Sequence, residues 1–327
     1  MKIWKPLYIG MGAILAAGSV ATGEYGLSKV NREIYETAVS LDSDMQALGF
    51  EDFSIRDYKI RFYSGDCDYV VKKDGADDKV TVTKEAAVLD VFAGTTLFVD
   101  GEYQVLLPAY EQFKSLFDVM GAAGTISEGT LAFTEDSYSE DSHVATMWHE
   151  AFHAWQMNNW EQDIDAWEEQ IGDSVENDRE ELIVNEVDSK KEMVTAFEQE
   201  MKLLREAYGK SNDAGKKELL EQALELAKKR EAGLSKQANA MEFYLENLEG
   251  SAMYVESMAY QRLEGDEAWK ENYMGDFSYE NGSGKYYHMG MLKCLLLDEL
   301  MPGWQGRFSG ACGLNELLAE CIGQQGG

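Results

Sequence analysis

The spacing of hydrophobic residues changes along the chain and separates a mixed N-terminal part from a helical C-terminal part. Residues 30–48 repeat their apolar positions with the period of an amphipathic helix. From residue 58 the pattern becomes short alternating or β-branched runs, separated by glycine and aspartate turns. These runs predict a small, largely antiparallel sheet with strands at residues 58–63, 69–71, 79–83, 87–92, 95–99 and 103–107.

The next segments alternate between helix and strand. Residues 110–120 predict a helix and residues 129–134 a further strand. Residues 142–157 then form a broad apolar face at helical spacing without any glycine or proline. Asp141 or Ser142 can serve as the N-cap of this helix, and residues 157–159 are expected to end it.

Residues 160–263 are almost entirely helical in pattern and strongly charged. Residues 180–208 and 216–240 predict two long helices joined by a turn at residues 209–215. This hairpin either walls a cleft or packs only as part of a bundle. The expected fold is therefore α+β, with an N-terminal sheet subdomain at residues 22–140 and a mainly helical part at residues 141–327, into which a helical hairpin is inserted at about 161–240.

The helix at residues 142–157 carries the motif His149-Glu150-Ala151-Phe152-His153. Helix positions four apart lie one turn apart on the same face, so both imidazoles can reach one metal ion. Neutral imidazole suits Zn²⁺, and a carboxylate beside the ion can take a proton from the water that the ion activates. We predict that His149 and His153 are zinc ligands and that Glu150 is the general base. The alternative is an amphipathic helix that carries two histidines by coincidence.

A catalytic zinc ion needs a third protein ligand, and no third histidine follows closely. The helix at residues 241–263 offers a stripe of glutamates that would ordinarily face solvent. Glu249 is favoured because it borders the apolar stripe and precedes Gly250; a glycine within a helix costs about 1 kcal/mol, which suggests that another backbone, expected to be the motif helix, passes close by. Glu256 is the second choice for the third ligand, or it is an outer partner that contacts one of the ligands. The stripe consists of Glu242, Glu246, Glu249 and Glu256.

The two motifs together resemble the gluzincin group of zinc metallopeptidases. The resemblance rests on H-E-A-F-H from His149 and E-G-S-A-M-Y from Glu249, and it covers residues 129–156 and 241–307. It implies a zincin-like fold in which His149, His153 and Glu249 hold Zn²⁺. In such folds a strand at the sheet edge pairs with an extended substrate, a role that we assign to residues 130–133. The chain departs from the best-known members by nearly a hundred residues between His153 and Glu249.

The resemblance also implies a tyrosine or histidine that donates a hydrogen bond to the oxyanion of the reaction. The glycine-rich residues 282–290 predict a loop before an apolar helix at residues 291–300. Tyr287 is favoured as the donor, then His288, then Tyr286. Alternatively, these side chains only cover the start of a core helix. The remaining histidine, His143, is expected at the surface.

The N-terminus has the pattern of an export signal. Lys2 and Lys5 precede a mostly apolar run at residues 7–21 that ends in small residues, which predicts a signal peptide cleaved after Ala21. The alternative is an uncleaved membrane anchor, although 15 residues are short for a bilayer that needs about 20. We therefore expect a secreted, periplasmic or cell-surface protein.

The four cysteines and the large negative charge limit the possible disulfide bonds and binding partners. Cys67, Cys294, Cys312 and Cys321 allow three disulfide pairings, which stay open, and Cys294 lies in an apolar run typical of a buried free thiol. A net charge of −31 argues against binding to nucleic acids and to anionic lipid.

These observations favour an exported zinc metallopeptidase that hydrolyses peptide or protein substrates. Two alternatives remain: a non-catalytic exported binding or scaffold protein that uses its acidic helical hairpin, and a zinc hydrolase that acts on a non-peptide amide or ester.

Overall fold

The computed structural model describes residues 26–74, 79–89, 93–114, 138–172, 179–275 and 277–323. Its internal contacts fall into two units, each assembled from three segments of the chain. The first unit comprises Met1–Leu48, Asp52–Asn158 and Val255–Gly275, and the second comprises Gly49–Glu51, Asn159–Tyr254 and Asp276–Gly327.

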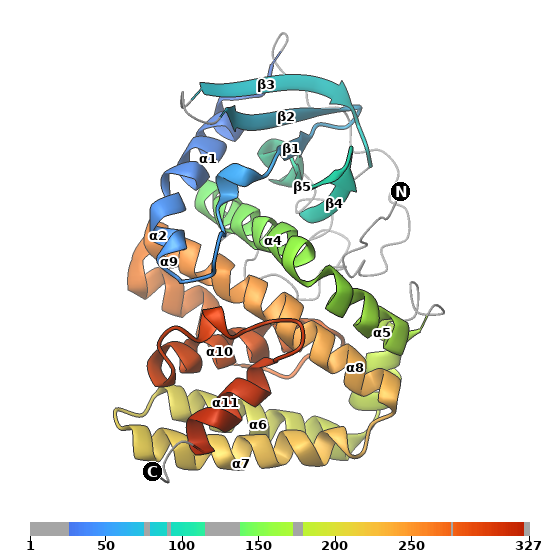
Figure 1. Cartoon of the computed structure of the whole chain (residues 1–327), viewed down its shortest axis with the longest axis vertical. Helices are drawn as coiled ribbons and strands as arrows, with labels where there is room; N and C mark the ends of the chain where they lie inside the picture. Colours follow the sequence, from blue (N-terminus) through green and yellow to red (C-terminus); the bar gives the residue numbers. More distant parts are fainter. Residues whose placement is uncertain are drawn as a thin grey trace. The chain divides into compact units, whose positions relative to one another are not determined.

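The first unit contains a five-stranded mixed sheet with the strand order β3-β2-β1-β5-β4 (Figure 1). β1 and β5 are parallel, while the other three neighbouring pairs are antiparallel, as largely expected. Residues 87–89 form no strand, which corrects part of the prediction for residues 87–92; residues 90–92 lie outside the described residues. The strands are β1 (Ile60–Tyr63), β2 (Cys67–Asp74), β3 (Lys79–Ala86), β4 (Thr95–Val99) and β5 (Glu102–Pro108).

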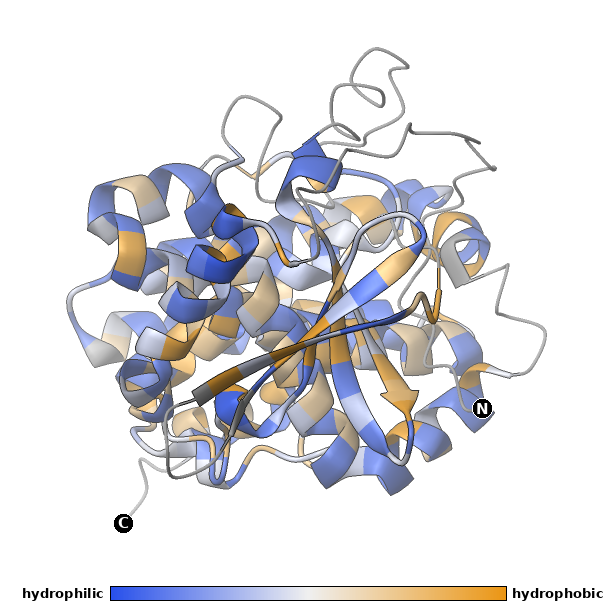
Figure 2. Ribbon diagram, turned by 90° about the horizontal axis from the view of Figure 1, so that it is seen from above, coloured by the Kyte–Doolittle hydropathy of each residue, from blue (hydrophilic) through white to orange (hydrophobic). Residues whose placement is uncertain are grey.

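Both faces of β1 and of most of β5 are buried, yet the sheet contains hydrophilic as well as hydrophobic residues (Figure 2). Ile60 and Phe62 are completely buried, and Arg61 between them is almost as inaccessible. A buried guanidinium needs hydrogen-bonding partners to offset its lost hydration. The Arg61 Nε donates to Gln104 Oε1 at 2.5 Å, and its Nη2 donates to Glu85 Oε2 at 2.8 Å. The sheet therefore has a polar centre as well as an apolar core.

Two short helices replace the single helix expected at residues 30–48. They are α1 (Lys29–Ser40) and α2 (Asp42–Gln46), separated at Leu41. Ser28 caps α1, because its side chain accepts a hydrogen bond from Asn31 N. The Asp42 carboxylate accepts from Ile55 N at 3.1 Å and anchors the start of α2 to the 3₁₀ turn η1 (Ile55–Asp57).

The motif helix is longer than expected. α4 (Glu140–Ile171) continues through a kink at Trp160, where φ is −121°, so the end predicted at residues 157–159 is a bend. Its N-cap is Ser139, not Asp141 or Ser142. Ser139 Oγ accepts from Ser142 N at 3.2 Å, and Ser142 Oγ accepts from Ser139 N at 3.1 Å. This reciprocal pair satisfies two backbone donors where the helix begins.

The second unit is helical. The antiparallel hairpin of α6 and α7 is confirmed, but residues 189–190 and 232–235 interrupt the longer helices that were expected (Figure 1). α9 begins in this unit and continues into the first. The elements are α5 (Arg179–Ile183), η4 (Val184–Asp188), α6 (Lys191–Tyr208), α7 (Asp213–Glu231), α8 (Lys236–Tyr244), η5 (Leu245–Glu249), α9 (Gly250–Tyr273), α10 (Gly284–Leu300), η6 (Trp304–Gly306) and α11 (Leu314–Gly323).

Two of the predicted segments cannot be compared with the structure. Residues 1–21, the expected signal or anchor, and residues 129–134, the expected strand, lie outside the described residues. Within the part that the structure describes, every helix is too short or too polar to cross a bilayer. All four cysteines are free thiols, and Cys294 is completely buried, as expected.

His143 is buried, which corrects the expectation of a surface residue. It is 1% exposed and packs against the rings of Tyr110 and Phe113. Its Nδ1 lies 2.7 Å from the Tyr138 hydroxyl. Burial lowers the pKa of His143 to about 3, so the folded protein holds this imidazole in its neutral form.

The pH dependence of stability should reveal this histidine. Below pH 6.5, its approximate pKa in an unfolded chain, only the unfolded state takes up the proton. The contribution of His143 is therefore complete above pH 6.5 and is lost as the pH falls towards 3. We expect protonation of this histidine in the unfolded state to lower the free energy of unfolding by about 1.4 kcal/mol per pH unit in this window. Urea titrations at pH 7 and pH 5 should show a smaller pH dependence for His143→Phe; an identical dependence would contradict the assignment.

Candidate metal centre

The two motif histidines point the same ring atoms at each other. His149 and His153 are 7% and 2% exposed, and their Nε2 atoms lie 3.0 Å apart. The Nδ1 atoms face away: that of His149 lies 2.8 Å from Glu256 Oε2, and that of His153 lies 2.7 Å from Gln156 Oε1. Because these oxygens accept hydrogen bonds, each Nδ1 carries the proton and each Nε2 keeps its lone pair. Two lone pairs at this distance repel unless a proton or a cation lies between them.

A buried carboxylate joins this pair. His149, His153 and Glu249 are the one group of metal-ligand side chains found in the described part of the chain, with ligand atoms within 4.8 Å of one another. Glu249 is the last residue of η5 and is 2% exposed. Two imidazole nitrogens and one carboxylate oxygen form a donor set that suits zinc and leaves a fourth position open. The donor chemistry therefore fits a zinc ion, although the same donors also bind neighbouring transition metals.

Glu256, the alternative third ligand, lies behind His149. One of its oxygens contacts His149 Nδ1, and the other accepts a hydrogen bond from the Tyr273 hydroxyl at 2.9 Å. Burial, followed by the negative charge of Glu256, raises the pKa of Tyr273 well above its ordinary value. Tyr273 thus stays protonated and donates to Glu256. This arrangement matches an outer partner that orients a histidine ligand.

Glu150 lies against the beginning of β4. The Thr96 hydroxyl lies 2.7 Å from the Glu150 carbonyl oxygen and 3.3 Å from its Oε2. A Cβ atom on Gly94 would lie 2.9 Å from both Cγ and Oε1 of Glu150. The missing side chain at Gly94 therefore leaves room for the carboxylate that we predict to be the base.

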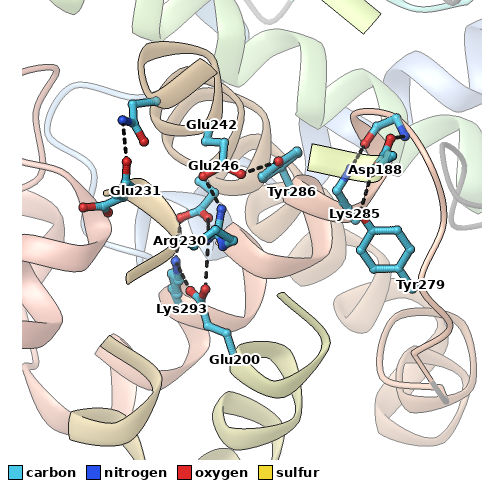
Figure 3. Close-up of polar contacts among 12 residues, drawn as sticks. Asp188, Glu200, Arg230, Glu231, Glu242, Glu246, Tyr279, Lys285, Tyr286 and Lys293 are labelled. Carbon is cyan, nitrogen blue, oxygen red and sulfur yellow. Dashed lines mark hydrogen bonds and ion pairs between the residues drawn. The ribbon is translucent and has the colours of Figure 1, made fainter. Parts of the chain in front are cut away.

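The other two glutamates of the acidic stripe have different partners. Glu242 and Glu246 are buried, so the ordinary interpretation of such a stripe as a solvent-exposed face does not apply to them. Glu242 pairs with Arg230, and Glu246 pairs with Lys293 at 2.5 Å (Figure 3). These ion pairs occupy both carboxylates within the second unit.

The expected glycine-rich loop is mostly helix, because α10 begins at Gly284. Tyr286 is completely buried, and its hydroxyl donates to Glu242 Oε1 at 2.5 Å. Tyr286 therefore belongs to the ion-pair network shown in Figure 3. Tyr287 and His288 are half-buried on the first turns of α10. Their role as oxyanion donors stays a prediction.

Another backbone approaches Gly250 closely, as expected, but the prediction that it belongs to the motif helix is wrong. A Cβ atom on Gly250 would lie 2.5 Å from the Cα of Gly290, which belongs to α10 and not to the motif helix. The glycine pair lets the backbones of η5 and α10 touch. Gly250 is therefore explained by close packing against Gly290 within the second unit.

Three residues around the candidate centre were missed in the sequence. Gln156 lies three positions after His153, and this helical spacing was a usable signal for its contact with the ring. Thr96 and Tyr273 carry no such signal. Tyr273 follows a helix break at Gly265, where φ is 84°, so the period of the preceding helix does not reach it.

Comparison with protein-family models, with curated proteins and with solved structures returned no match for this chain. The gluzincin resemblance therefore rests on the two motifs, and the geometry of their side chains has to support any functional argument.

Proposed function

We propose that this chain is a zinc-dependent metallopeptidase with a zincin-like fold, in which His149, His153 and Glu249 hold a single ion. The supporting observation is the convergence of two Nε2 atoms, 3.0 Å apart, with a buried carboxylate oxygen. Hydrogen bonds from both Nδ1 atoms to outer acceptors fix the rings in the orientation that a metal ligand requires. Export and a peptide or protein substrate belong to the same proposal.

A bound zinc ion would polarise the scissile carbonyl and make water acidic enough to serve as a nucleophile near neutral pH. Glu150 would accept a proton from the attacking water and pass it to the leaving amine. Thr96 lies within hydrogen-bonding distance of the Glu150 carboxylate, at 3.3 Å, and limits the directions that it can take. The Glu150 side chain thus has a defined position against the beginning of β4.

Metal analysis of the purified full chain tests the proposal. We expect one zinc ion per chain in the wild type. Glu249→Gln should weaken zinc binding by more than about a hundred-fold, because it removes a ligand, whereas Glu256→Gln should weaken it by about ten-fold, as for an outer partner. Glu221→Gln, on the exposed face of α7, is the matched control and should bind zinc like the wild type.

Two outcomes would contradict the proposal. A chain without any bound zinc would favour a scaffold function of the acidic hairpin, and wild-type affinity in Glu249→Gln would refute the ligand set. Stoichiometric zinc with hydrolysis of esters or small amides, but of no peptide library, would change the substrate class and retain the metal centre.

A further inference from the structure

One wide turn interrupts the helical run that carries all four glutamates of the acidic stripe. α8 leads directly into the π-helix η5, which leads directly into α9. The turn is defined by the hydrogen bond from Gly250 N to the carbonyl oxygen of Leu245, five residues earlier. A π-turn inserts about one extra residue into an α-helix, and such turns are frequent at functional sites.

The wide turn divides the acidic stripe. In an uninterrupted α-helix the four glutamates would lie on one face. One extra residue changes the direction of the side chains that follow by about 100°. Glu242 and Glu246 accordingly contact Arg230 and Lys293. Glu256, beyond the turn, contacts His149, and Glu249 joins the group of His149 and His153.

Side chains satisfy the backbone groups around this turn. Asn247 Nδ2 donates to the carbonyl oxygen of Phe243 at 2.7 Å, and Ser251 Oγ donates to the carbonyl oxygen of Asn247 at 2.6 Å. Asn247 Oδ1 also accepts from Leu314 N, at the start of α11, at 2.8 Å. Carbonyl groups that lose their regular helical donors in a π-turn are costly when buried without a partner. Asn247 is thus bonded both within the turn and to a neighbouring helix.

α10 holds the same turn from another side. Gly290 lies against Gly250 and the carbonyl group of Glu246, with no room for a side chain. Three residues further along α10, Lys293 Nζ pairs with Glu246 at 2.5 Å (Figure 3). The turn is therefore bonded within itself, to α11 and to α10.

We propose that the π-turn at Leu245–Glu249 directs Glu249 towards the two histidines and that Asn247 is the positioning residue that maintains this turn. The inference rests on the proposed function, because it assumes that Glu249 binds the metal ion. Asn247 itself touches neither substrate nor metal; it acts through the conformation of the backbone that carries Glu249.

Cobalt substitution in the full chain tests this role without an activity assay. The variant is Asn247→Leu, and the matched control is Asn239→Leu on α8, where the amide donates to the carbonyl oxygen of Glu231 outside the turn. Glu249→Ala supplies the visible spectrum of a cobalt site without this ligand. We expect Asn247→Leu to weaken Co²⁺ binding by about ten-fold or more and to shift the spectrum towards that of Glu249→Ala. Asn239→Leu should retain the wild-type affinity and spectrum.

The outcomes separate the two proposals. Failure of the wild type to bind Co²⁺ would refute the metal centre itself. A wild-type chain that binds Co²⁺, together with an Asn247→Leu variant of unchanged affinity and spectrum, would overturn the positioning role even if the variant were less stable. If Asn247→Leu does not fold, Ser251→Ala removes the hydroxyl that donates to the carbonyl oxygens of Asn247 and Leu248 in the same turn. An unchanged cobalt affinity and spectrum in Ser251→Ala would then count against the role of the turn in directing Glu249.

Discussion

Glu150→Gln should retain the bound metal ion and lose almost all turnover. The amide keeps the size of the side chain but has no basicity at neutral pH, so it cannot take the proton of the attacking water. Loss of a general base typically lowers kcat by about 10²- to 10⁴-fold. Glu150 is not one of the three residues in the proposed ligand group, so the affinity for zinc should change little.

The matched control for this variant is Glu161→Gln, which makes the same replacement at an exposed position of α4. Zinc content, thermal stability and kcat/KM on a peptide library should be measured for both variants and the wild type. Wild-type turnover in Glu150→Gln would refute its role as the base. Loss of zinc in that variant would instead place Glu150 among the ligands.

The largest effect on stability is expected from Lys293→Met. Lys293 is completely buried on α10 and pairs with Glu246 at 2.5 Å and with Glu200 at 3.3 Å. Arg230 is the other cation of this cluster (Figure 3). Burial raises the pKa of Glu246 to about 6, because its carboxylate has lost the hydration that favours the charged form. Removing one partner of a buried ion pair costs about 3–5 kcal/mol. In Lys293→Met the buried carboxylates of Glu200, Glu242 and Glu246 would have to share the single positive charge of Arg230.

Urea unfolding of Lys293→Met and of the surface control Lys229→Met measures this difference. Lys229 pairs with Glu225 in an exposed helical pair, which should be almost neutral for stability. The double variant Lys293→Met/Glu246→Leu should regain part of the lost stability, since it also removes the carboxylate that has lost Lys293 as its partner. Equal stability of Lys293→Met and the wild type would contradict the buried network.

Local periodicity predicted the helices and strands of this chain better than it predicted which of them pair in the fold. Strand β4 has the same bounds in the sequence pattern and in the structure, because residues 95–99 are a largely β-branched run with Gly94 before it and Asp100-Gly101 after it. The motif helix follows from its apolar spacing in the same way. No local signal indicates that β1 and β5 pair in parallel, because residues 60–63 and 105–108 are brought together only by the tertiary fold.

The acidic stripe shows where sequence reasoning reached its limit. A helical period of 3.6 residues placed Glu242, Glu246, Glu249 and Glu256 on one face, but the π-turn at Leu245–Glu249 changes that period. The contacts that hold the turn come from α10 and α11, far along the chain. Gly250 indicated a close backbone correctly, yet a glycine does not identify which backbone approaches it.

The deep burial of His149, His153 and Glu249 has a kinetic consequence. Each residue is between 2% and 7% exposed, so a chelator, like a peptide substrate, would need the surrounding structure to open before it reached an ion bound to them. The rates at which the ion binds and is removed would then be limited by local opening of the fold, as for other buried groups that exchange through transient openings. The rate at which a chelator removes the ion should consequently reach a plateau as the chelator concentration is raised.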